Sequence, residues 1–363
     1  MAIHQVFPEQ YQQQLDDKIQ QLSADFTGFV APEVEVFTSA PRHYRMRAEF
    51  KMWQEKGQAH YAMYQPGEYK KPFIIDNFEV GSEIINQLMP KLLTAINKND
   101  LLRERLFQTE FLTTLSGEAV ITLIYHKALT DEWEAEANTL REHLGVSIIG
   151  RSRKQKRVLG DDFVIEKLSV NDRIFSYQQV ETGFTQPNAE VCEKMLAWAL
   201  DASTELKGDL LELYCGNGNF TVPLATHFNR VLATEISKTS VKSAQFNLQQ
   251  NQIDNVEIVR MSSEEFSQAM DKQRSFRRLA DINLDSYEFS TVFVDPPRAG
   301  LDDHTVDIVK GFDNILYVSC NPETLRHNLK SICETHDIKR FAAFDQFPYT
   351  PHLECGVLLQ RKR

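Results

Sequence analysis

The second half of the chain alternates short apolar runs with helical segments, and this alternation constrains the fold more than any other feature. The apolar runs lie at residues 210–214, 230–235, 256–259, 291–294, 315–318, 340–344 and 355–360. Strands that alternate with helices indicate a mostly parallel sheet covered on both faces. We therefore predict an α/β domain over residues 176–363.

Residues 1–175 show a different pattern. Helical periodicity is found at residues 11–22, 80–93 and 131–144, the last with Thr130 or Asp131 as a plausible cap. Strand-like runs lie at residues 44–53, 107–115 and 119–125. This mixture, which lacks a Gly-rich phosphate loop, predicts a separate α+β domain.

Composition limits where the protein acts. No run of about 18 apolar residues is present, so we expect no membrane span. The start of the chain, residues 1–6, lacks the basic and apolar stretches of a secretory signal. The five cysteines are odd in number and form no CxxC pair, which favours reduced thiols over a disulfide framework or a zinc site. We expect a cytoplasmic monomer without a metal ion.

Reactive groups follow two neighbouring predicted strands. Cys320 ends one apolar run, and Asp295 ends another as the first residue of Asp-Pro-Pro-Arg298. Ligands bind outside the carboxyl ends of the strands in an open parallel sheet, so a thiol and an acid would share one crevice. A buried, inert thiol is the alternative, but the Asn321-Pro322 that follows indicates a partly exposed one.

The first strand of the α/β domain leads into a glycine turn, Gly216-Asn-Gly218, that lacks the third glycine of a dinucleotide motif. The turn carries no cation, and the next strand ends in Glu235, an acid suited to a ribose diol. A glycine turn without pyrophosphate features predicts a nucleoside cofactor without phosphate, such as S-adenosylmethionine.

The net charge of −11 argues against a nucleic-acid partner, but the local distribution does not. Residues 151–157 include five cations, and residues 42–51 interleave cations with aromatic rings. Cations with flat rings suit phosphates and unstacked bases. A solvated basic face remains the alternative.

Together these motifs resemble the RNA 5-methyluridine methyltransferases, on residues 184–188, 211–219, 295–298, 319–322 and 353–356. Residues 43–50 and 344–349 resemble the tRNA (uracil-5-)-methyltransferase branch, which acts on the T loop. Related ribosomal RNA enzymes typically carry an N-terminal four-cysteine iron-sulfur motif. No cysteine precedes Cys192 here, so we expect no cluster.

The resemblance implies a Rossmann-like, S-adenosylmethionine-dependent methyltransferase sheet behind an N-terminal RNA-binding domain. It implies methylation of C5 of uridine 54 in the T loop of tRNA, and of other RNAs with a T-like loop. Cys320 would add to C6 of uracil, Glu354 would remove the C5 proton, and Arg298 would polarise the base. The cofactor site implied is Gln186, Tyr214, Asn219, Glu235 and Asp295.

Uridine 54 is tucked inside the tRNA, so its extraction costs a few kcal/mol of unstacking. We expect the N-terminal domain to grip the T loop through Arg45, Arg47 and Lys51, with residues 151–157 as a second basic segment. The family uses an aromatic ring near Phe107 to contact bases. That role needs an exposed ring, whereas a core position is the alternative.

Three other classes remain open at this point. An adenine amino-methyltransferase also uses a Pro-Pro turn, but it needs no thiol and has an aromatic residue in place of Arg298. A nicotinamide oxidoreductase conflicts with the incomplete glycine pattern. A non-catalytic RNA-binding or RNA-folding protein is the third, and RNA folding could also be an added role.

Overall fold

The computed structural model describes residues 5–65, 67 and 72–363, so the first residues of the chain, used above to judge a signal sequence, lie partly outside it. The chain forms two compact units. The seven-stranded unit contains residues 1–9, 40–167 and 179–189, and the eight-stranded unit contains residues 10–39, 168–178 and 190–363.

This division differs from the single boundary predicted near residue 175, because the chain passes between the units several times. Residues 10–39 belong with the C-terminal part because β1 (Glu35–Phe37) pairs in parallel with β16 (His336–Phe344). A three-residue edge strand without clear alternation gives little signal in the sequence.

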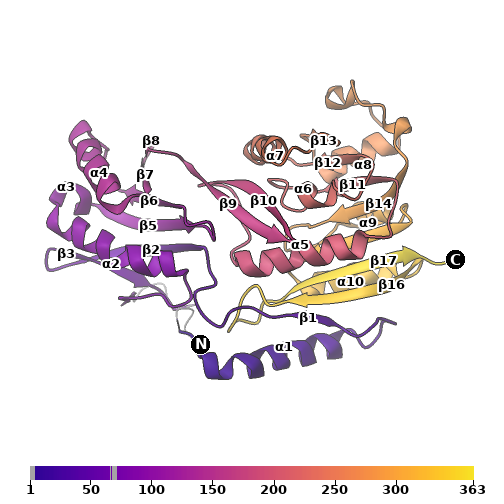
Figure 1. The fold of residues 1–363 in the computed structure, drawn as a ribbon, viewed down its shortest axis with the longest axis horizontal. Coiled ribbons are helices and arrows are strands. Elements are labelled where there is room, and N and C mark those ends of the chain that lie inside the picture. The colour runs from indigo at the N-terminus through magenta and orange to yellow at the C-terminus, as the bar shows by residue number, and fades with distance from the viewer. Residues whose placement is uncertain (1–4, 66, 68–71) are drawn as a thin grey trace. The chain divides into compact units, whose positions relative to one another are not determined.

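The eight-stranded sheet has the order β1-β16-β17-β15-β14-β11-β12-β13 (Figure 1). Its further strands are β11 (Asp209–Leu213), β12 (Val231–Thr234), β13 (Val256–Val259), β14 (Phe289–Val294), β15 (Asn314–Ser319) and β17 (Glu354–Arg361). Strands β11 to β15 pair in parallel, and β17 is antiparallel to β15 and β16. All seven strands predicted in this region are present, and the mostly parallel α/β sheet is confirmed.

Helices cover both faces of this sheet, as a parallel sheet requires. One hydrophobic core joins it to α1 (Tyr11–Asp25), α8 (Ser263–Met270), α9 (Asp303–Val309) and α10 (Pro322–Ile332). On the other face, Trp198 of α5 (Ala189–Ser203) packs edge-on against Phe344, with ring centroids 5.8 Å apart. Gly356 leaves the space that Trp198 fills, because a Cβ there would come within 2.7 Å of the indole.

The seven-stranded sheet has the order β4-β3-β2-β5-β6-β7-β8. Its strands are β2 (Arg47–Glu55), β3 (Gln58–Met63), β4 (Phe73–Ile74), β5 (Leu106–Thr113), β6 (Ala119–Tyr125), β7 (Ser147–Ser152) and β8 (Gln155–Leu159). Its helices are α2 (Glu83–Lys98), α3 (Asp100–Arg103) and α4 (Asp131–Leu144). The α+β prediction is confirmed, and Thr130 caps α4 by accepting from the Trp133 amide.

Five strands escaped prediction besides β1 and β4. They are β3, β7, β8 and the pair β9 (Phe163–Val170) and β10 (Arg173–Val180), which form their own two-stranded sheet. Several carry exposed charges at alternate positions, which weakens the apolar signal. Within the described ranges, no helix is both long and apolar enough to cross a membrane. The same residues contain no group of three or more His, Cys, Asp or Glu side chains placed to hold a metal ion.

Candidate active site at the strand ends of the eight-stranded unit

Three reactive side chains meet at the carboxyl edge of the sheet. Asp295 follows β14 and Cys320 follows β15, and these two strands pair in parallel. Strand β17 lies on the other side of β15, with Ser319 opposite Cys355. The next step of this antiparallel register sets Cys320 beside Glu354, the first residue of β17. The expected meeting of thiol and acid at one edge is therefore observed.

Both acids of this cluster hold their protons unusually tightly. Glu354 is only 4% exposed, and burial, with a smaller contribution from the charge of Asp295, raises its pKa to about 8. Burial also raises the pKa of Asp295 to about 7. Acids that titrate near neutral pH are suited to exchange protons during a reaction.

Cys320 is half-buried beside these acids. Burial raises the pKa of its thiol to about 11, the charges of Glu354 and Asp295 add to this, and Arg298 opposes it. The resting thiol is therefore protonated, and it must lose its proton as it reacts. Cys215 and Cys355 are buried, as expected for cysteines that pack.

The loop after β14 is tied to the turn that follows Cys320. The carbonyl of Arg298 accepts hydrogen bonds from the side chains of Asn321 at 3.2 Å and Thr324 at 3.4 Å. The Arg298 side chain is exposed, and its charge also helps to lower the pKa of His352 after the larger effect of burial. Arg298 thus adds a positive charge to the surroundings of Cys320 and His352.

A glycine turn follows β11 at the same edge. Gly216 has a φ of 57°, and nothing lies within 4 Å of the position of a Cβ there. Glu235, which follows β12, accepts from the Gly216 amide at 3.0 Å and from the Ser237 amide at 2.6 Å. The carboxylate therefore stands beside an open glycine turn, and each oxygen retains a lone pair for a ligand hydroxyl.

Tyr214 and Asn219 flank this turn. Tyr214 adopts a φ of 64°, and its hydroxyl lies 2.7 Å from that of Ser263, at the start of α8. The side-chain amide of Asn219 donates to the Cys192 sulfur at 3.4 Å, and the backbone carbonyl of Asn219 accepts from the Tyr177 hydroxyl at 3.0 Å. Both residues are held from outside the turn, which fixes its shape.

Two residues of this region were missed in the sequence. Glu212 of β11 is 1% exposed, burial together with Asp295 raises its pKa to about 8, and one carboxyl oxygen has no partner among the described residues. Ile236, next to Glu235, is 68% exposed. The sequence contained a signal for each residue. Glu212 is an acid inside an apolar strand, and Ile236 is an apolar residue directly after the strand-end acid Glu235. A buried polar atom, an open glycine turn and an exposed apolar side chain together fit a nucleoside.

Gln186 belongs to residues 179–189, which are part of the seven-stranded unit. Its side-chain oxygen is buried and has no hydrogen-bond partner among the residues that the structure describes. A buried, unsatisfied oxygen is costly and suits a ligand donor. The assignment of Gln186 to the cofactor remains a prediction.

The predicted RNA-binding arginines are occupied within their own unit. Arg47 donates to the carbonyl of Gly183 at 2.6 Å and also to that of Glu181, and Arg45 donates to the carbonyl of Arg47 at 2.8 Å. Burial lowers the pKa of both guanidinium groups. Arg47 thus braces the turn at residues 181–183 rather than pairing with Glu49, the alternative its position in the strand suggests.

Lys51 and Phe107 form a different arrangement on neighbouring strands. The Lys51 ammonium lies 4.2 Å from the centroid of the Phe107 ring and also donates to Gln108. Phe107 is 38% exposed and stacks on His126, with centroids 4.2 Å apart, whereas Phe111 is buried in the core. The ring is therefore exposed, as a stacking role requires, and His126 is a neighbour that the sequence did not reveal.

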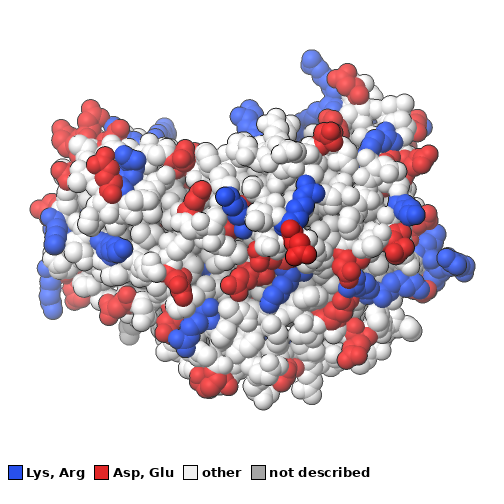
Figure 2. Space-filling model, viewed as in Figure 1, with Lys and Arg blue, Asp and Glu red and all other residues white. Residues whose placement is uncertain are grey.

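Ion pairs neutralise much of the basic segment at residues 151–157. Arg151 contacts Glu181 at 2.6 Å, Lys156 contacts Asp162 at 2.6 Å, and Arg157 contacts Asp131 and Glu134. Figure 2 shows cations and acids interspersed over the visible face of the molecule. This segment is therefore a weaker candidate for binding phosphates than the sequence alone indicates.

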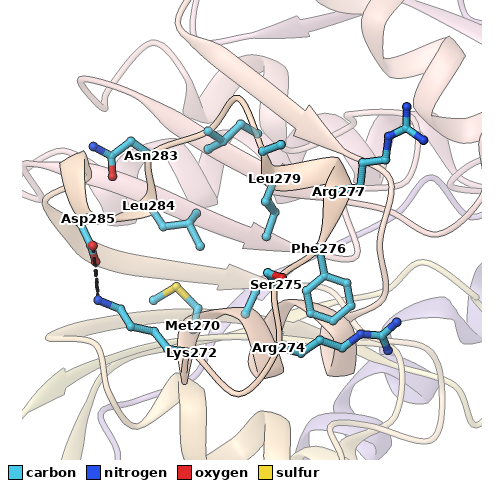
Figure 3. A pocket seen from close by; sticks show the side chains of 13 residues that line it. Met270, Lys272, Arg274, Ser275, Phe276, Arg277, Leu279, Asn283, Leu284 and Asp285 are labelled. Carbon is cyan, nitrogen blue, oxygen red and sulfur yellow. Dashed lines mark hydrogen bonds and ion pairs between the residues drawn. The ribbon is translucent and has the colours of Figure 1, made fainter.

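A separate cavity of about 700 Å³ lies at the C-terminal end of α8, beside the short helices η2 (Arg277–Leu279) and η3 (Leu284–Ser286). Figure 3 shows Met270, Phe276 and Leu284 lining it, with Lys272 paired to Asp285 at its rim. None of the predicted site residues lines this cavity. The start of α8, not its end, contacts Tyr214.

The sheet, the open glycine turn and the strand-end acids define a Rossmann-like methyltransferase fold with a thiol added at the site. The sequence model of the tRNA (uracil-5-)-methyltransferases matches residues 10–362. The chain belongs to this family, as its motifs predicted. That membership confirms an S-adenosylmethionine-dependent methyltransferase with tRNA as substrate, and it decides against the adenine amino-methyltransferase and the nicotinamide oxidoreductase.

Several relatives match nearly the whole chain. The tRNA/tmRNA (uracil-C(5))-methyltransferase of Saccharophagus degradans is 61% identical over 99% of this chain and 98% of its own length. The enzyme of the same name from Acinetobacter baylyi is 55% identical over 96% of this chain and 98% of its own. The tRNA (uracil-54, C5)-methyltransferase of Pyrococcus abyssi, solved with S-adenosyl-L-homocysteine, shares the fold with a TM-score of 0.74, at 22% identity over 96% of this chain and 83% of its own.

Proposed function

We propose that the enzyme methylates C5 of uridine 54 in the T loop of tRNA, with Cys320 as the nucleophile and Glu354 as the base that removes the C5 proton. The observation that carries this proposal is the strand register, which sets a half-buried thiol beside a buried acid whose pKa is raised to about 8. Uracil C5 is a poor nucleophile, and a thiolate adding at C6 makes it electron-rich.

In the proposed reaction the Cys320 thiol gives up its proton to solvent as its sulfur forms a bond to C6. The electron pair of the C5–C6 double bond shifts toward C5 and the O4 oxygen. Bound S-adenosylmethionine would supply an electrophilic methyl group to C5, with the methyl–sulfur bond breaking to leave S-adenosylhomocysteine. Glu354 then accepts the C5 proton, the electron pair re-forms the double bond, and Cys320 leaves as a thiolate. The positive charge of Arg298 would stabilise the electron-rich ring.

The cofactor would be held by the residues around the glycine turn. Glu235 would accept from the ribose hydroxyls, a role supported by its bond to the amide of the open Gly216 turn, and the exposed Ile236 would offer an apolar surface to the base. Tyr214, Asn219 and Asp295 stand at the same edge, and Glu212 offers a buried carboxyl oxygen. Gln186 is a further proposed cofactor residue, because its side-chain oxygen is buried and has no hydrogen-bond partner among the described residues.

The T loop is the proposed target for two reasons. The family acts on uracil C5 in tRNA, and the name of the Pyrococcus abyssi enzyme specifies uracil 54. The relatives above are named for tmRNA as well as tRNA, which supports activity on other RNAs with a T-like loop. On the seven-stranded unit, the exposed Phe107 ring and the Lys51 cation combine the features that a splayed base and its phosphate need.

The test uses an unmodified tRNA transcript and S-adenosylmethionine with a labelled methyl group. Nuclease digestion should locate the label in 5-methyluridine at position 54, and a transcript with cytidine at that position should remain unlabelled. Label in another nucleoside, or at another uridine, would overturn the proposal. A T-arm hairpin and a tmRNA fragment in parallel would define the RNA range.

A further inference from the structure

The loop that precedes Glu354 is gripped by the first long helix of the chain. Residues 345–353 connect β16 to β17, and Phe344 lies opposite Glu354 in their antiparallel pairing. The two ends of the loop are therefore adjacent. Because Glu354 is the first residue of β17, the conformation of this loop decides where its carboxyl group stands.

Lys18 of α1 holds both ends of the loop at once. Its ammonium donates to the Asp345 carboxylate at 2.7 Å, to the Phe347 carbonyl at 2.9 Å and to the His352 carbonyl at 3.1 Å. An ammonium has three protons, so these acceptors saturate it. The Lys18 side chain is 9% exposed and that of Asp345 is fully buried. The last acceptor is two residues before Glu354.

Gln14, one turn earlier on the same face of α1, extends the grip. It donates to the second Asp345 oxygen at 2.9 Å and accepts from the Tyr349 amide at 3.2 Å. Tyr349 adopts a φ of 62°, a left-handed conformation that persists in a bulky residue only when its surroundings fix it. The ring of Tyr11 contacts that of Tyr349, with centroids 6.3 Å apart.

A buried ammonium is a costly way to close a loop, since apolar packing of the same volume serves stability equally well. What an ammonium adds is direction, because it fixes three oxygen atoms at once. Two of the acceptors, Asp345 and Phe347, lie near the start of the loop and the third, His352, lies near its end, so together they define its path into β17. Precise placement is what a base needs, since an error of about 1 Å can cost about 100-fold in rate.

We propose that Lys18 is a positioning residue for proton removal: its buried ammonium fixes residues 345–353 and thereby holds the Glu354 carboxyl group beside Cys320. This inference rests on the proposed role of Glu354 as the base. Lys18 touches neither substrate nor cofactor in this scheme and acts only through the loop.

The test follows a labelled methyl group from S-adenosylmethionine into tRNA in a single turnover. Denaturing gels separate free tRNA from the covalent protein–tRNA complex, so methyl entry and complex decay are measured separately. In Lys18→Met, methyl entry should stay within about threefold of the wild type, while the methylated complex should decay about 10- to 100-fold more slowly. The complex should therefore accumulate.

Lys339→Met is the matched control, because Lys339 lies on β16 and, among the residues that the structure describes, its ammonium makes only an exposed ion pair with Asp337. It should behave as the wild type. Complex decay in Lys18→Met equal to that of the control would overturn the inference. So would an equal loss of methyl entry and decay, since a purely structural defect lowers both.

Two variants keep the test decisive if Lys18→Met does not fold. Gln14→Leu removes the second grip without stranding a charge, and Lys18→Met combined with Asp345→Asn removes both charges of the buried pair. A thermal melt identifies which variants are folded. Slower decay of the complex is expected in both, and unchanged decay in both would overturn the inference.

Glu354→Gln separates this inference from the proposed function. Accumulation in Glu354→Gln but not in the Lys18 variants would refute the positioning role alone. No accumulation in Glu354→Gln would refute the assignment of the base, and the role of Lys18 with it.

Discussion

Two regions carry predicted functional residues, but their side chains have different surroundings. One is the sheet edge where β14 and β15 end and β17 begins, and the other is the basic segment at residues 42–51 near β2. Asp295, Cys320 and Glu354 gather at one sheet edge, where burial raises all three pKa values. Along the basic segment, Arg47 is bound to backbone carbonyls, whereas Lys51 lies against an exposed ring. Parallel strands bring their ends together whatever residues they carry, but a charge on a sheet surface depends on its particular partners.

The free-energy cost of burying ionisable groups explains the contrast. Burying several acids together destabilises the fold and is typical of functional sites, so a cluster of raised pKa values indicates function. A guanidinium that bonds to carbonyls has a sufficient structural explanation, so its charge says little about RNA. If this contrast reflects function, substitutions at the strand ends should affect catalysis far more than substitutions of the arginines in residues 42–51.

The largest effect should come from the nucleophile. Cys320→Ala should abolish the covalent adduct with tRNA that contains 5-fluorouridine, because fluorine cannot leave as a proton does, and should lower turnover by at least about 1,000-fold, as for other covalent nucleophiles. Cofactor affinity should be nearly unchanged. Cys333→Ala is the control, since burial raises the pKa of that half-buried thiol to about 11 as well. An adduct that survives Cys320→Ala would eliminate Cys320.

Glu354→Gln should separate the base from the nucleophile. Its amide cannot accept the C5 proton, so a methylated covalent complex should accumulate and product release should fall by about 100-fold or more. Denaturing gels of a single turnover measure this. Glu334→Gln, on the surface beside Lys310, is the control. Release of product at the normal rate would mean that another group takes the proton.

Glu235→Ala tests the cofactor side of the same sheet edge. The change removes charge-assisted hydrogen bonds of about 1.5–3 kcal/mol, so the dissociation constant for S-adenosylmethionine should rise by about one to two orders of magnitude. Part of this loss comes from the Gly216 amide, which Glu235 fixes. Calorimetry gives the constant, with Glu257→Ala on neighbouring β13 as control. An unchanged value would mean that Glu235 does not hold the cofactor.

The pH dependence follows from the raised pKa of Glu354, about 8 in the folded protein. Only the ionised carboxylate accepts a proton, so decay of the methylated complex should accelerate about tenfold per pH unit below pH 8 and level off above it. The folded state also holds this proton more tightly than the unfolded state, whose pKa is near 4.5. Stability is therefore lost as pH rises from about 4.5 to 8.

Glu354→Gln cannot ionise and should escape this loss. Thermal melts at pH 6 and pH 9 measure this. Relative to the wild type, the free energy of unfolding of the variant should rise by about 2 kcal/mol between pH 6 and pH 9, once coupling to Asp295 is allowed for. A difference that does not change with pH would show that the carboxyl group is not held protonated by burial.

The smallest effects should divide the basic segment itself. Lys51→Ala should weaken tRNA binding severalfold, because one phosphate contact is lost. The slope of log K against log salt concentration should become shallower by about 0.9, and the melting temperature should not change. Arg47→Ala should lower the melting temperature, because the carbonyls of Glu181 and Gly183 lose their donor. Lys91→Ala, exposed on α2, is the control for both. A normal melt with weakened binding in Arg47→Ala would restore that residue to the RNA surface.

Local sequence was sufficient for the regular parts of both units. The bounds of α4, β6 and β13 match the predictions, because each has a strong periodic pattern with clear ends. Short strands such as β1 and β4 have too few residues for a pattern. The motif at residues 353–356 identified Glu354 through resemblance, although an acid at that position reads by itself as a surface residue.

What the sequence alone determined is the alternation of strands and helices, the glycine turn, and the thiol and acids that end the strands. Only the tertiary structure decided that β17 lies between β15 and β16, which buries Glu354 beside Cys320. It also decided that Lys18 reaches Asp345 and that Arg47 reaches Gly183. The physical reason is the distance in sequence over which each effect acts. Periodicity and turn chemistry depend on residues a few positions apart. Burial and the pKa shifts that it causes depend on distant segments that packing brings together.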